Sequence, residues 1–259
     1  MATQVAARFV AARRAGVALH DYPGALPNSL ATAYERQDAA IALWPDVIAG
    51  WKVGKIPDAW CDRLGEERLV GPIFRDNVQW LAPGDSGLLR VIPGGFAAVE
   101  AEYIFELAHD ADPSQRRFSL DEAQMLVAQM RLGIEFAGSP LASINVLGPA
   151  VVVSDFGNNA GLLVGPAVVD WQRTWPDLVC ETFIEGRSVG RGGAASISGG
   201  PLAALAFALE RNARRRRPLK KGDLVSTGAS TGIHDIRIGE RAQVQFTGGA
   251  VLYCEARSA

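Results

Sequence analysis

The stretch that decides the fold is FAAVEAEYIFEL, residues 96–107. From Val99 to Leu107 every odd position is apolar, whereas Glu100, Glu102 and Glu106 occupy even positions. A period of two predicts a half-buried β-strand, because alternate side chains lie on the same face. Side chains spaced by two residues on that face stand only about 7 Å apart. The acidic face of this strand is therefore expected to point either to water or to a positive group.

Length and composition are those of an ordinary globular protein. The 259 residues are 48% hydrophobic and 21% charged, and the formal net charge of −2 gives no general attraction to nucleic acid or to an anionic membrane surface. The three cysteines and three histidines are scattered, which argues against a disulfide framework and against a histidine-rich metal site. No apolar run reaches the roughly 18 residues that a membrane span requires. An anionic substrate would have to be held by local groups.

The first 16 residues contain three arginines and no acid, a composition that they share with transit peptides. Val5, Phe9 and Ala12, however, form one stripe at helical spacing, and no small-residue cleavage site follows. We therefore interpret this stretch as the amphipathic first helix of the fold. We expect the protein to reside in a reducing cytoplasm.

Residues 1–50 are predicted to be mainly helical, with Asn28 or Ser29 as the N-cap of a second helix. From residue 51 onward, short apolar runs alternate with Gly and Pro, a pattern typical of strands joined by tight turns. The chain is thus predicted to be one compact unit, in which a helical N-terminal segment (1–50) precedes a β-rich domain (51–259).

Helices are also expected inside the β-rich part. One follows the N-cap Ser119 and is predicted to end near Leu132, and another begins near Pro201. The runs GIEFAG (133–138) and AVVVSDF (150–156) are predicted to be buried strands because they are short, apolar and bounded by polar or Gly-rich segments.

Two features mark the C-terminal third. The stretch 177–192 is predicted to be a hairpin with its turn at Glu185 and Gly186. The basic run ARRRRPLKK (213–221) follows a predicted helix, where cations are favourable, and is interpreted as a solvated helix end. Because the rest of the chain shows no basic stripe, nucleic-acid binding is disfavoured.

Three carboxylates are candidate metal ligands. Glu100 and Glu102 point the same way from the strand 96–107, and Glu135 lies in an otherwise apolar run. A buried carboxylate is costly unless it is paired or binds a cation. An all-oxygen site without histidine or thiolate suits Mg²⁺, Mn²⁺ or Ca²⁺. From spacing alone, a solvated acidic face plus an unrelated buried acid is the more economical interpretation.

Lys52 is the positive counterpart of these acids. It lies between Trp51 and Val53 in GWKVG (50–54). In such an apolar strand a lysine must find an acidic partner or lose its proton. Lys55 is the better candidate for a surface lysine.

Two polar loops are candidates for holding an oxygen-rich small substrate. SDFGNNAG (154–161) contains Asp155, Asn158 and Asn159, and STGASTG (226–232) offers hydroxyls and free backbone N–H groups. Small polar loops are more often simple turns, so each is a weak indication by itself. The sequence contains no dinucleotide fingerprint in a strand–helix context, no P-loop and no nucleophile elbow.

A series of short motifs becomes specific when taken in chain order. The motifs are GWKVG, GPIF, VEAEYIFEL, GIEFAGS, SDFGNNAGLLVG, GPLAALAF, LKKGDLVSTGASTG and GERAQVQFTGGAVLYCE. This ordered set closely resembles the 2-keto-4-pentenoate hydratase / 4-oxalocrotonate decarboxylase family of the fumarylacetoacetate hydrolase superfamily. The resemblance extends from about residue 28 to the C-terminus.

The resemblance implies an α+β fold, a mixed β-roll of the fumarylacetoacetase C-terminal-domain type, with residues 51–259 as the catalytic domain. It also implies a Mg²⁺ or Mn²⁺ site. On matching positions, the metal ligands would be Glu100, Glu102 and Glu135; the catalytic residues would be Lys52 and Asp76; and the residues near the substrate would be Asn158, Asn159, Ser230 and Thr231.

The activity that the resemblance implies is the hydration of a 2-hydroxy-2,4-dienoate, of the 2-keto-4-pentenoate type, to a 4-hydroxy-2-oxo acid in aromatic meta-cleavage catabolism. The alternatives are a 4-oxalocrotonate-type decarboxylase, another 2-oxo acid lyase or hydrolase of the superfamily, and a non-catalytic assembly subunit. A decarboxylase would need a second cationic group, for which Arg75 and Arg191 are candidates. The expected partners are the small-molecule substrate and further copies of the chain in a homo-oligomer.

The chain also departs from the family pattern at two places. Lys55-Ile56-Pro57 stands where the family usually has small hydroxyl residues. Gly138-Ser139-Pro140 stands where the family often has an acid followed by Ser-Arg, so both charges are lost. These departures leave the metal chemistry plausible but put the distal group of the substrate in doubt.

Overall fold

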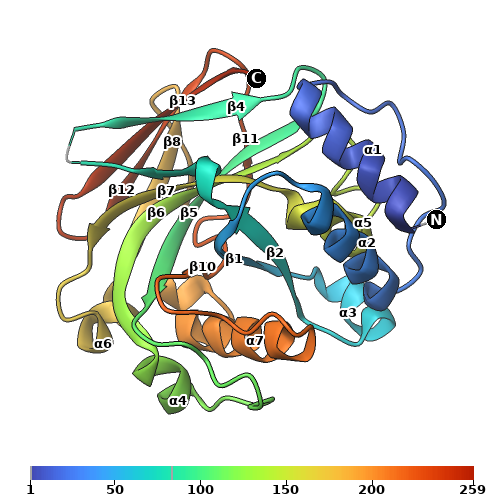
Figure 1. Ribbon diagram of the computed structural model, residues 1–259. Helices are drawn as coiled ribbons and strands as arrows, with labels where there is room; N and C mark the ends of the chain where they lie inside the picture. The colour runs from blue at the N-terminus through green and yellow to red at the C-terminus, as the bar shows by residue number, and fades with distance from the viewer. Residues whose placement is uncertain (1, 83) are drawn as a thin grey trace.

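A computed structural model describes residues 2–82 and 84–259, and Figure 1 shows two β-sheets flanked by helices. Within these residues the larger sheet is built from β1 (Ile48–Lys55), β2 (Arg68–Phe74), β3 (Val78–Trp80), β5 (Phe96–Leu107), β6 (Val127–Ser139), β7 (Asn159–Ala167), β10 (Leu224–Ser226) and β11 (His234–Asp235). The order of its strands is β2-β1-β10-β5-β6-β7-β3, and β11 pairs with β5. Parallel and antiparallel pairs both occur, so the sheet is mixed, as expected.

The smaller sheet packs against the larger one. Its strands in the described part of the chain are β4 (Ser86–Val91), β13 (Val251–Ser258), β12 (Arg241–Phe246), β8 (Val179–Ile184) and β9 (Arg187–Gly193), in that order. Tyr103 of the larger sheet meets Phe246 of the smaller one edge to face, and both rings belong to the main core. The predicted hairpin turn is confirmed, because Glu185 and Gly186 between β8 and β9 both have positive φ angles, as a tight two-residue turn requires.

Strand β6 corrects one prediction from the sequence. Ser119 caps the helix α4 (Leu120–Met125) through a capping box with Glu122, but this helix ends at Met125 rather than near Leu132. From Val127 onward the chain pairs with β5 along its whole length. Long-range pairing with β5 therefore outweighs the local helical pattern of residues 127–132.

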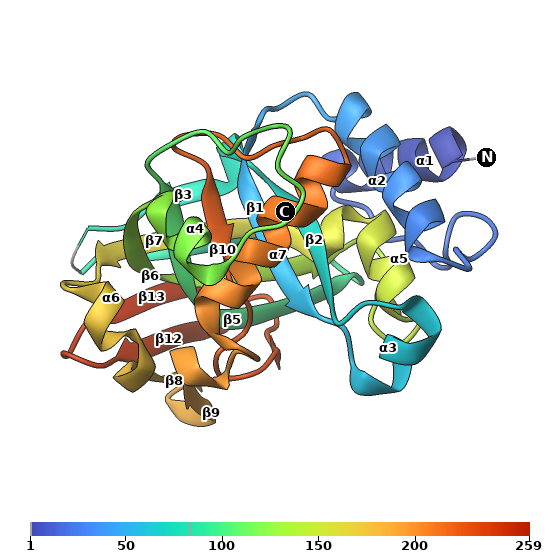
Figure 2. The same cartoon turned by 90° about the horizontal axis from the view of Figure 1, so that it is seen from below.

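The helices lie outside the two sheets. They are α1 (Ala2–Ala15), α2 (Leu30–Leu43), α3 (Asp58–Leu64), α4, α5 (Pro149–Ser154), α6 (Trp171–Thr174) and α7 (Gly200–Arg214), together with the short 3₁₀ turns η1 (Arg75–Asn77), η2 (Phe156–Asn158), η3 (Trp175–Asp177) and η4 (Ala194–Ser196). Helix α1 packs on α2, α2 packs on α5, and α5 packs against β2, whereas α7 packs against β1 and β2 (Figure 2). None of the described helices has the length and apolar character needed to cross a membrane.

Helix α5 corrects a second prediction, since AVVVSDF was expected to be a strand. Pro149 stands at the first turn, where its missing N–H is no loss, and every residue of α5 is buried. A segment that is apolar on all sides shows no helical period, so periodicity cannot distinguish it from a buried strand.

The N-terminal helices follow the sequence prediction. Val5 and Phe9 of α1 are buried in the main core, and Ser29 accepts a hydrogen bond from the N–H of Thr32 as the N-cap of α2. The division at residue 50 stays a prediction, although β1 begins at Ile48.

The basic run 213–221 is less solvated than expected. Only 8% of the Arg215 side chain is exposed, and its guanidinium lies 4.4 Å from the ring centre of Tyr34. Arg215 and Arg217 both contact Asp38 of α2, at 2.8 and 2.9 Å. Part of the run therefore fastens α7 to α2 instead of facing water.

Candidate metal centre and active site

Three glutamates converge in the interior of the larger sheet. Glu100 of β5 and Glu135 of β6 are direct partners across the two strands, and Glu102 lies two residues further along the same face of β5. One carboxylate oxygen from each lies within 4.8 Å of the others. The three residues are 4%, 0% and 0% exposed for Glu100, Glu102 and Glu135. The half-buried strand expected from alternation is therefore buried on both faces.

The free oxygens of these carboxylates suit a hard cation. In the part of the chain that the structure describes, Glu100 Oε1, Glu102 Oε1 and Glu135 Oε2 are buried without a hydrogen-bond partner. Buried polar atoms are normally paired, and an unpaired carboxylate oxygen is especially costly. Three converging carboxylate oxygens can coordinate Mg²⁺ or Mn²⁺ and leave coordination positions for other oxygen ligands. The residues present thus fit a divalent cation.

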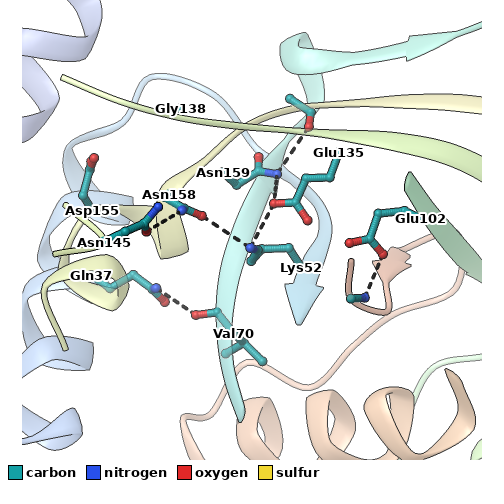
Figure 3. Close-up of polar contacts among 12 residues, drawn as sticks. Gln37, Lys52, Val70, Glu102, Glu135, Gly138, Asn145, Asp155, Asn158 and Asn159 are labelled. Carbon is teal, nitrogen blue, oxygen red and sulfur yellow. Dashed lines mark hydrogen bonds and ion pairs between the residues drawn. The ribbon is translucent and has the colours of Figure 1, made fainter. Parts of the chain in front are cut away.

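Lys52 lies against the acidic face, as the sequence predicted (Figure 3). Its Nζ lies 3.1 Å from Glu135 Oε1 and donates to Asn158 Oδ1 at 3.4 Å. Only 5% of the Lys52 side chain is exposed. When all three glutamates are ionised, as metal binding requires, three carboxylates and one ammonium leave two negative charges, which one divalent cation would balance. The positive group that the acidic face of β5 requires is therefore partly supplied by β1.

Burial and charge shift the acid–base properties of this cluster. Burial raises the pKa of Glu100 to about 7; Lys52 opposes this shift and Glu135 adds to it. Burial, with the charges of the other two carboxylates, raises the pKa of Glu102 well above its ordinary value. Burial alone would lower the pKa of Lys52, but the attraction of the three carboxylates outweighs it, so the pKa of Lys52 is raised. Lys52 therefore holds its proton while it faces the acids.

The two predicted asparagines lie where the turn η2 runs into β7: Asn158 ends η2 and Asn159 begins β7 (Figure 3). Asn159 Nδ2 donates to Glu135 Oε1 at 3.2 Å and so orients that carboxylate. Asn158 contacts Lys52, and its Nδ2 donates to Asn145 Oδ1 at 3.3 Å. Asn158 faces the cavity, whereas Asn159 supports a candidate metal ligand from behind.

The loop after β10 covers the other side of the cluster. The backbone N–H of Gly228 donates to Glu102 Oε2 at 2.7 Å, and the N–H of Ser230 donates to the carbonyl of Ala101 at 2.9 Å. Ser230 is buried. Thr231 points elsewhere, because its hydroxyl is hydrogen-bonded to Thr182 at 2.8 Å and to His234 at 3.1 Å. The loop meets the acids through its backbone, and the predicted roles of Ser230 and Thr231 near a substrate stay predictions.

Asp76 is not brought to the cluster. It is exposed on η1 and lines a separate hollow of about 220 Å³ beside Gln79 and Leu162. Its catalytic role stays a prediction that this arrangement does not support. Glu106 matches no family ligand position, and we expect it on the solvated rim of the strand. In the structure it is only partly exposed, and its Oε2 accepts hydrogen bonds from Gln129 at 2.7 Å and Arg131 at 3.0 Å.

A cavity of about 720 Å³ opens in front of Lys52 and Glu100. Sequence reasoning missed several residues of its wall, among them Trp60, Arg68, Asn145, Ser196 and Ile233. The strand pairing places Arg68 of β2 directly opposite Lys55 of β1. These residues come from segments far apart in the chain, and no single motif carries a signal for them. Arg75 and Arg191, the predicted second cations, are exposed and lie outside this wall.

Glu100→Gln is expected to weaken Mn²⁺ binding by more than about 100-fold. Even the loss of a residue that only hydrogen-bonds a metal ligand commonly lowers metal affinity by about 10- to 100-fold, and Glu100 is a proposed ligand itself. Glu106→Gln, the matched change on the same strand, should leave Mn²⁺ affinity unchanged. Isothermal titration calorimetry at neutral pH measures both. Equal affinities in the two variants would contradict the assignment of the ligands.

Metal binding is expected to depend on pH. The pKa of Glu100 rises from its ordinary 4.5 to about 7 on folding. Protonation of Glu100 therefore stabilises the folded protein at low pH, and this stabilisation is lost as the pH rises from about 4.5 to 7. A cation competes with protons for the same oxygens. Saturating Mg²⁺ should therefore raise the Tm more at about pH 8 than at about pH 6, as thermal unfolding with and without the ion can show. Equal increases at both pH values would argue against the coupling.

No family model matches the chain, and no curated protein matches its sequence. Among solved structures, 4-oxalocrotonate decarboxylase from Pseudomonas putida G7 complexed with magnesium and adipate is similar, with a TM-score of 0.81 and 18% identity over 98% of this chain and 97% of that chain.

A second neighbour is fumarylpyruvate hydrolase from Pseudomonas aeruginosa in complex with Mn²⁺ and pyruvate. Its TM-score is 0.60, with 18% identity over 81% of this chain and 89% of that chain. At these identities the likeness concerns the fold. The chain thus has the fold of the fumarylacetoacetate hydrolase superfamily, in agreement with the resemblance of its sequence motifs.

Proposed function

We propose that the protein is a divalent-metal-dependent enzyme that acts on a small 2-oxo acid or its 2-hydroxydienoate enol. The observation that carries the proposal is the set of three buried carboxylates, each with one free oxygen, beside a buried lysine at the end of a cavity. The neighbours with the same fold support it, since they include a decarboxylase with magnesium and a hydrolase with Mn²⁺. The cation in this chain would be Mg²⁺ or Mn²⁺.

The finer proposal is hydration of a 2-hydroxy-2,4-dienoate. In that reaction a proton moves from the C2 hydroxyl to C5 to give the conjugated 2-oxo-3-enoate, and water then adds across C3 and C4. When bound, the cation would supply Lewis-acid polarisation of the substrate oxygens. Lys52 contributes a positive charge beside Glu100 and Asn158, and Asn159 keeps Glu135 in its orientation.

Decarboxylation of a 4-oxalocrotonate-type dicarboxylate is the second candidate. Here the electron pair of the breaking bond to CO₂ flows through the conjugated system to the C2 oxygen, so the same cluster serves. Arg68 and Lys55 on the cavity wall favour this reaction because they could attract a second carboxylate. Asp58, Asp62 and Glu67 also line this part of the wall and oppose that attraction. For that reason hydration stays the first proposal.

A non-catalytic assembly subunit is disfavoured. A silent subunit would not need Lys52 and three buried carboxylates that each keep an oxygen without a hydrogen-bond partner, an arrangement that is costly in a folded interior. Assembly into a homo-oligomer is part of the proposal.

Two substrates separate the candidate reactions. The protein is incubated with Mg²⁺ and 2-hydroxypenta-2,4-dienoate, and separately with Mg²⁺ and 4-oxalocrotonate. Hydration predicts loss of the ultraviolet absorption of the dienoate without release of CO₂. Release of CO₂ from 4-oxalocrotonate would instead support decarboxylation, and no reaction with either substrate would overturn both.

Lys52→Met is expected to lower kcat by about 100-fold or more, because one positioned cationic hydrogen-bond donor that stabilises developing negative charge commonly contributes that much. The variant should still bind Mn²⁺, since the three carboxylates remain. Lys221→Met, a change of the same type at an exposed position, is the control and should keep the parent kcat. An unchanged kcat in Lys52→Met would exclude a catalytic role for this lysine.

A further inference from the structure

Helix α1 reaches the turn beside the site through one arginine, Arg13. Arg13 Nε donates to Asp155 Oδ1 at 2.6 Å, and Nη2 donates to Asp155 Oδ2 at 2.9 Å. The two side chains are 8% and 0% exposed. This is a buried, bidentate ion pair, the strongest form of arginine–carboxylate contact. Asp155, which the sequence suggested for substrate binding, is thus occupied by Arg13.

The same guanidinium also holds the backbone around the site. Nη1 donates to the carbonyl of Asn159 at 3.0 Å, and Nη2 donates to the carbonyl of Gly138 at 2.8 Å. Ser139 completes the arrangement, because its hydroxyl donates to Asp155 Oδ2 at 2.6 Å. Arg13 therefore joins three segments: α1, the end of β6 that carries Glu135, and the turn before β7.

The turn before β7 has a backbone that needs such support. Phe156, Gly157 and Asn158 have φ angles of 56°, 65° and 56°. The left-handed region is unfavourable for residues other than glycine, and most of all for a bulky one such as Phe156. Such a conformation persists only where its surroundings impose it. The Arg13–Asp155 pair binds the turn at its first residue and at Asn159, immediately after the strained positions.

We propose that Arg13 is a positioning residue for the metal centre. By holding the turn 155–159 it fixes Asn159 against Glu135 and Asn158 against Lys52. The inference rests on the proposed function, since it assumes that Glu135 binds a cation. It assigns a role to a residue outside the stretch that carries the family resemblance, which begins near residue 28. It also places a positive charge beside Gly138 and Ser139, next to Pro140, which stands where the family pattern has an arginine.

A positioning role for Arg13 can be distinguished from a purely structural role. A buried ion pair is weak evidence of net stabilisation, and removal of one partner destabilises a protein whatever its function. Loss of stability in Arg13→Ala would therefore not distinguish the two roles. The affinity of the folded variant for a metal ion does, because only a positioning role links Arg13 to the orientation of Glu135.

The experiment compares Arg13→Ala with Arg14→Ala in the full chain. Arg14 is the next residue of α1, is exposed and has the same charge. Calorimetric titration with Mn²⁺, well below the Tm of each variant, should show affinity weakened by at least about tenfold in Arg13→Ala and unchanged in Arg14→Ala. A lower Tm with unchanged Mn²⁺ affinity would overturn the proposal.

A second measurement needs no metal. Hydrogen exchange of the metal-free protein, followed by mass spectrometry, should rise over residues 155–161 in Arg13→Ala and stay at the parent level in the hairpin of β12 and β13. Unchanged exchange over residues 155–161 would overturn the proposal. If the parent protein itself binds no Mn²⁺, the proposed function fails, whereas the exchange result still reports on the turn.

Arg13→Lys and Asp155→Asn provide further variants in case Arg13→Ala does not fold. A lysine keeps the positive charge but has a single nitrogen, whereas the guanidinium makes its contacts with three nitrogens. The Mn²⁺ affinity of Arg13→Lys should therefore lie between that of the parent protein and that of Asp155→Asn. Parent-like affinity in both variants would overturn the proposal.

Discussion

The structure depends on one electrostatic constraint: three carboxylates share a buried face of β5 and β6 with a single ammonium group. Glu100 and Glu135 are cross-strand partners, an arrangement that like charges normally make unfavourable. Lys52 offsets part of this cost from β1. Two negative charges remain when all three glutamates are ionised, and together with the three free oxygens they explain why a divalent cation is the ligand that this interior fits.

The surrounding architecture serves to keep that cluster rigid and partly shielded. The backbone of the loop after β10 closes on Glu102, and the turn before β7 orients Glu135 and Lys52 through its two asparagines. Helix α1 supports the same turn through Arg13. A site whose ligands need accurate orientation is thus built on two long strands and held by outer contacts, as preorganisation requires.

Predictions from local pattern succeeded where the determining interactions are local. Ser29 and Ser119 cap helices, and Glu185-Gly186 forms the hairpin turn, because these roles depend on a few neighbouring residues. Predictions failed for α5 and for the first half of β6, where burial on all sides or pairing with β5 decides the structure. The placing of Asp76 away from the acids, and of Arg13 against Asp155, lay beyond any local pattern as well.

The sequence by itself determined the alternation in residues 96–107, the candidate acids, the candidate lysine and, through ordered motifs, the fold type. It could not decide whether the glutamate face meets water, and spacing alone favoured that it did. Only the tertiary structure decided the question, by bringing Lys52 of β1, Glu135 of β6 and the loop after β10 to this face. The physical reason is that alternation reports which side chains share a face, whereas the burial of that face depends on segments distant in the chain.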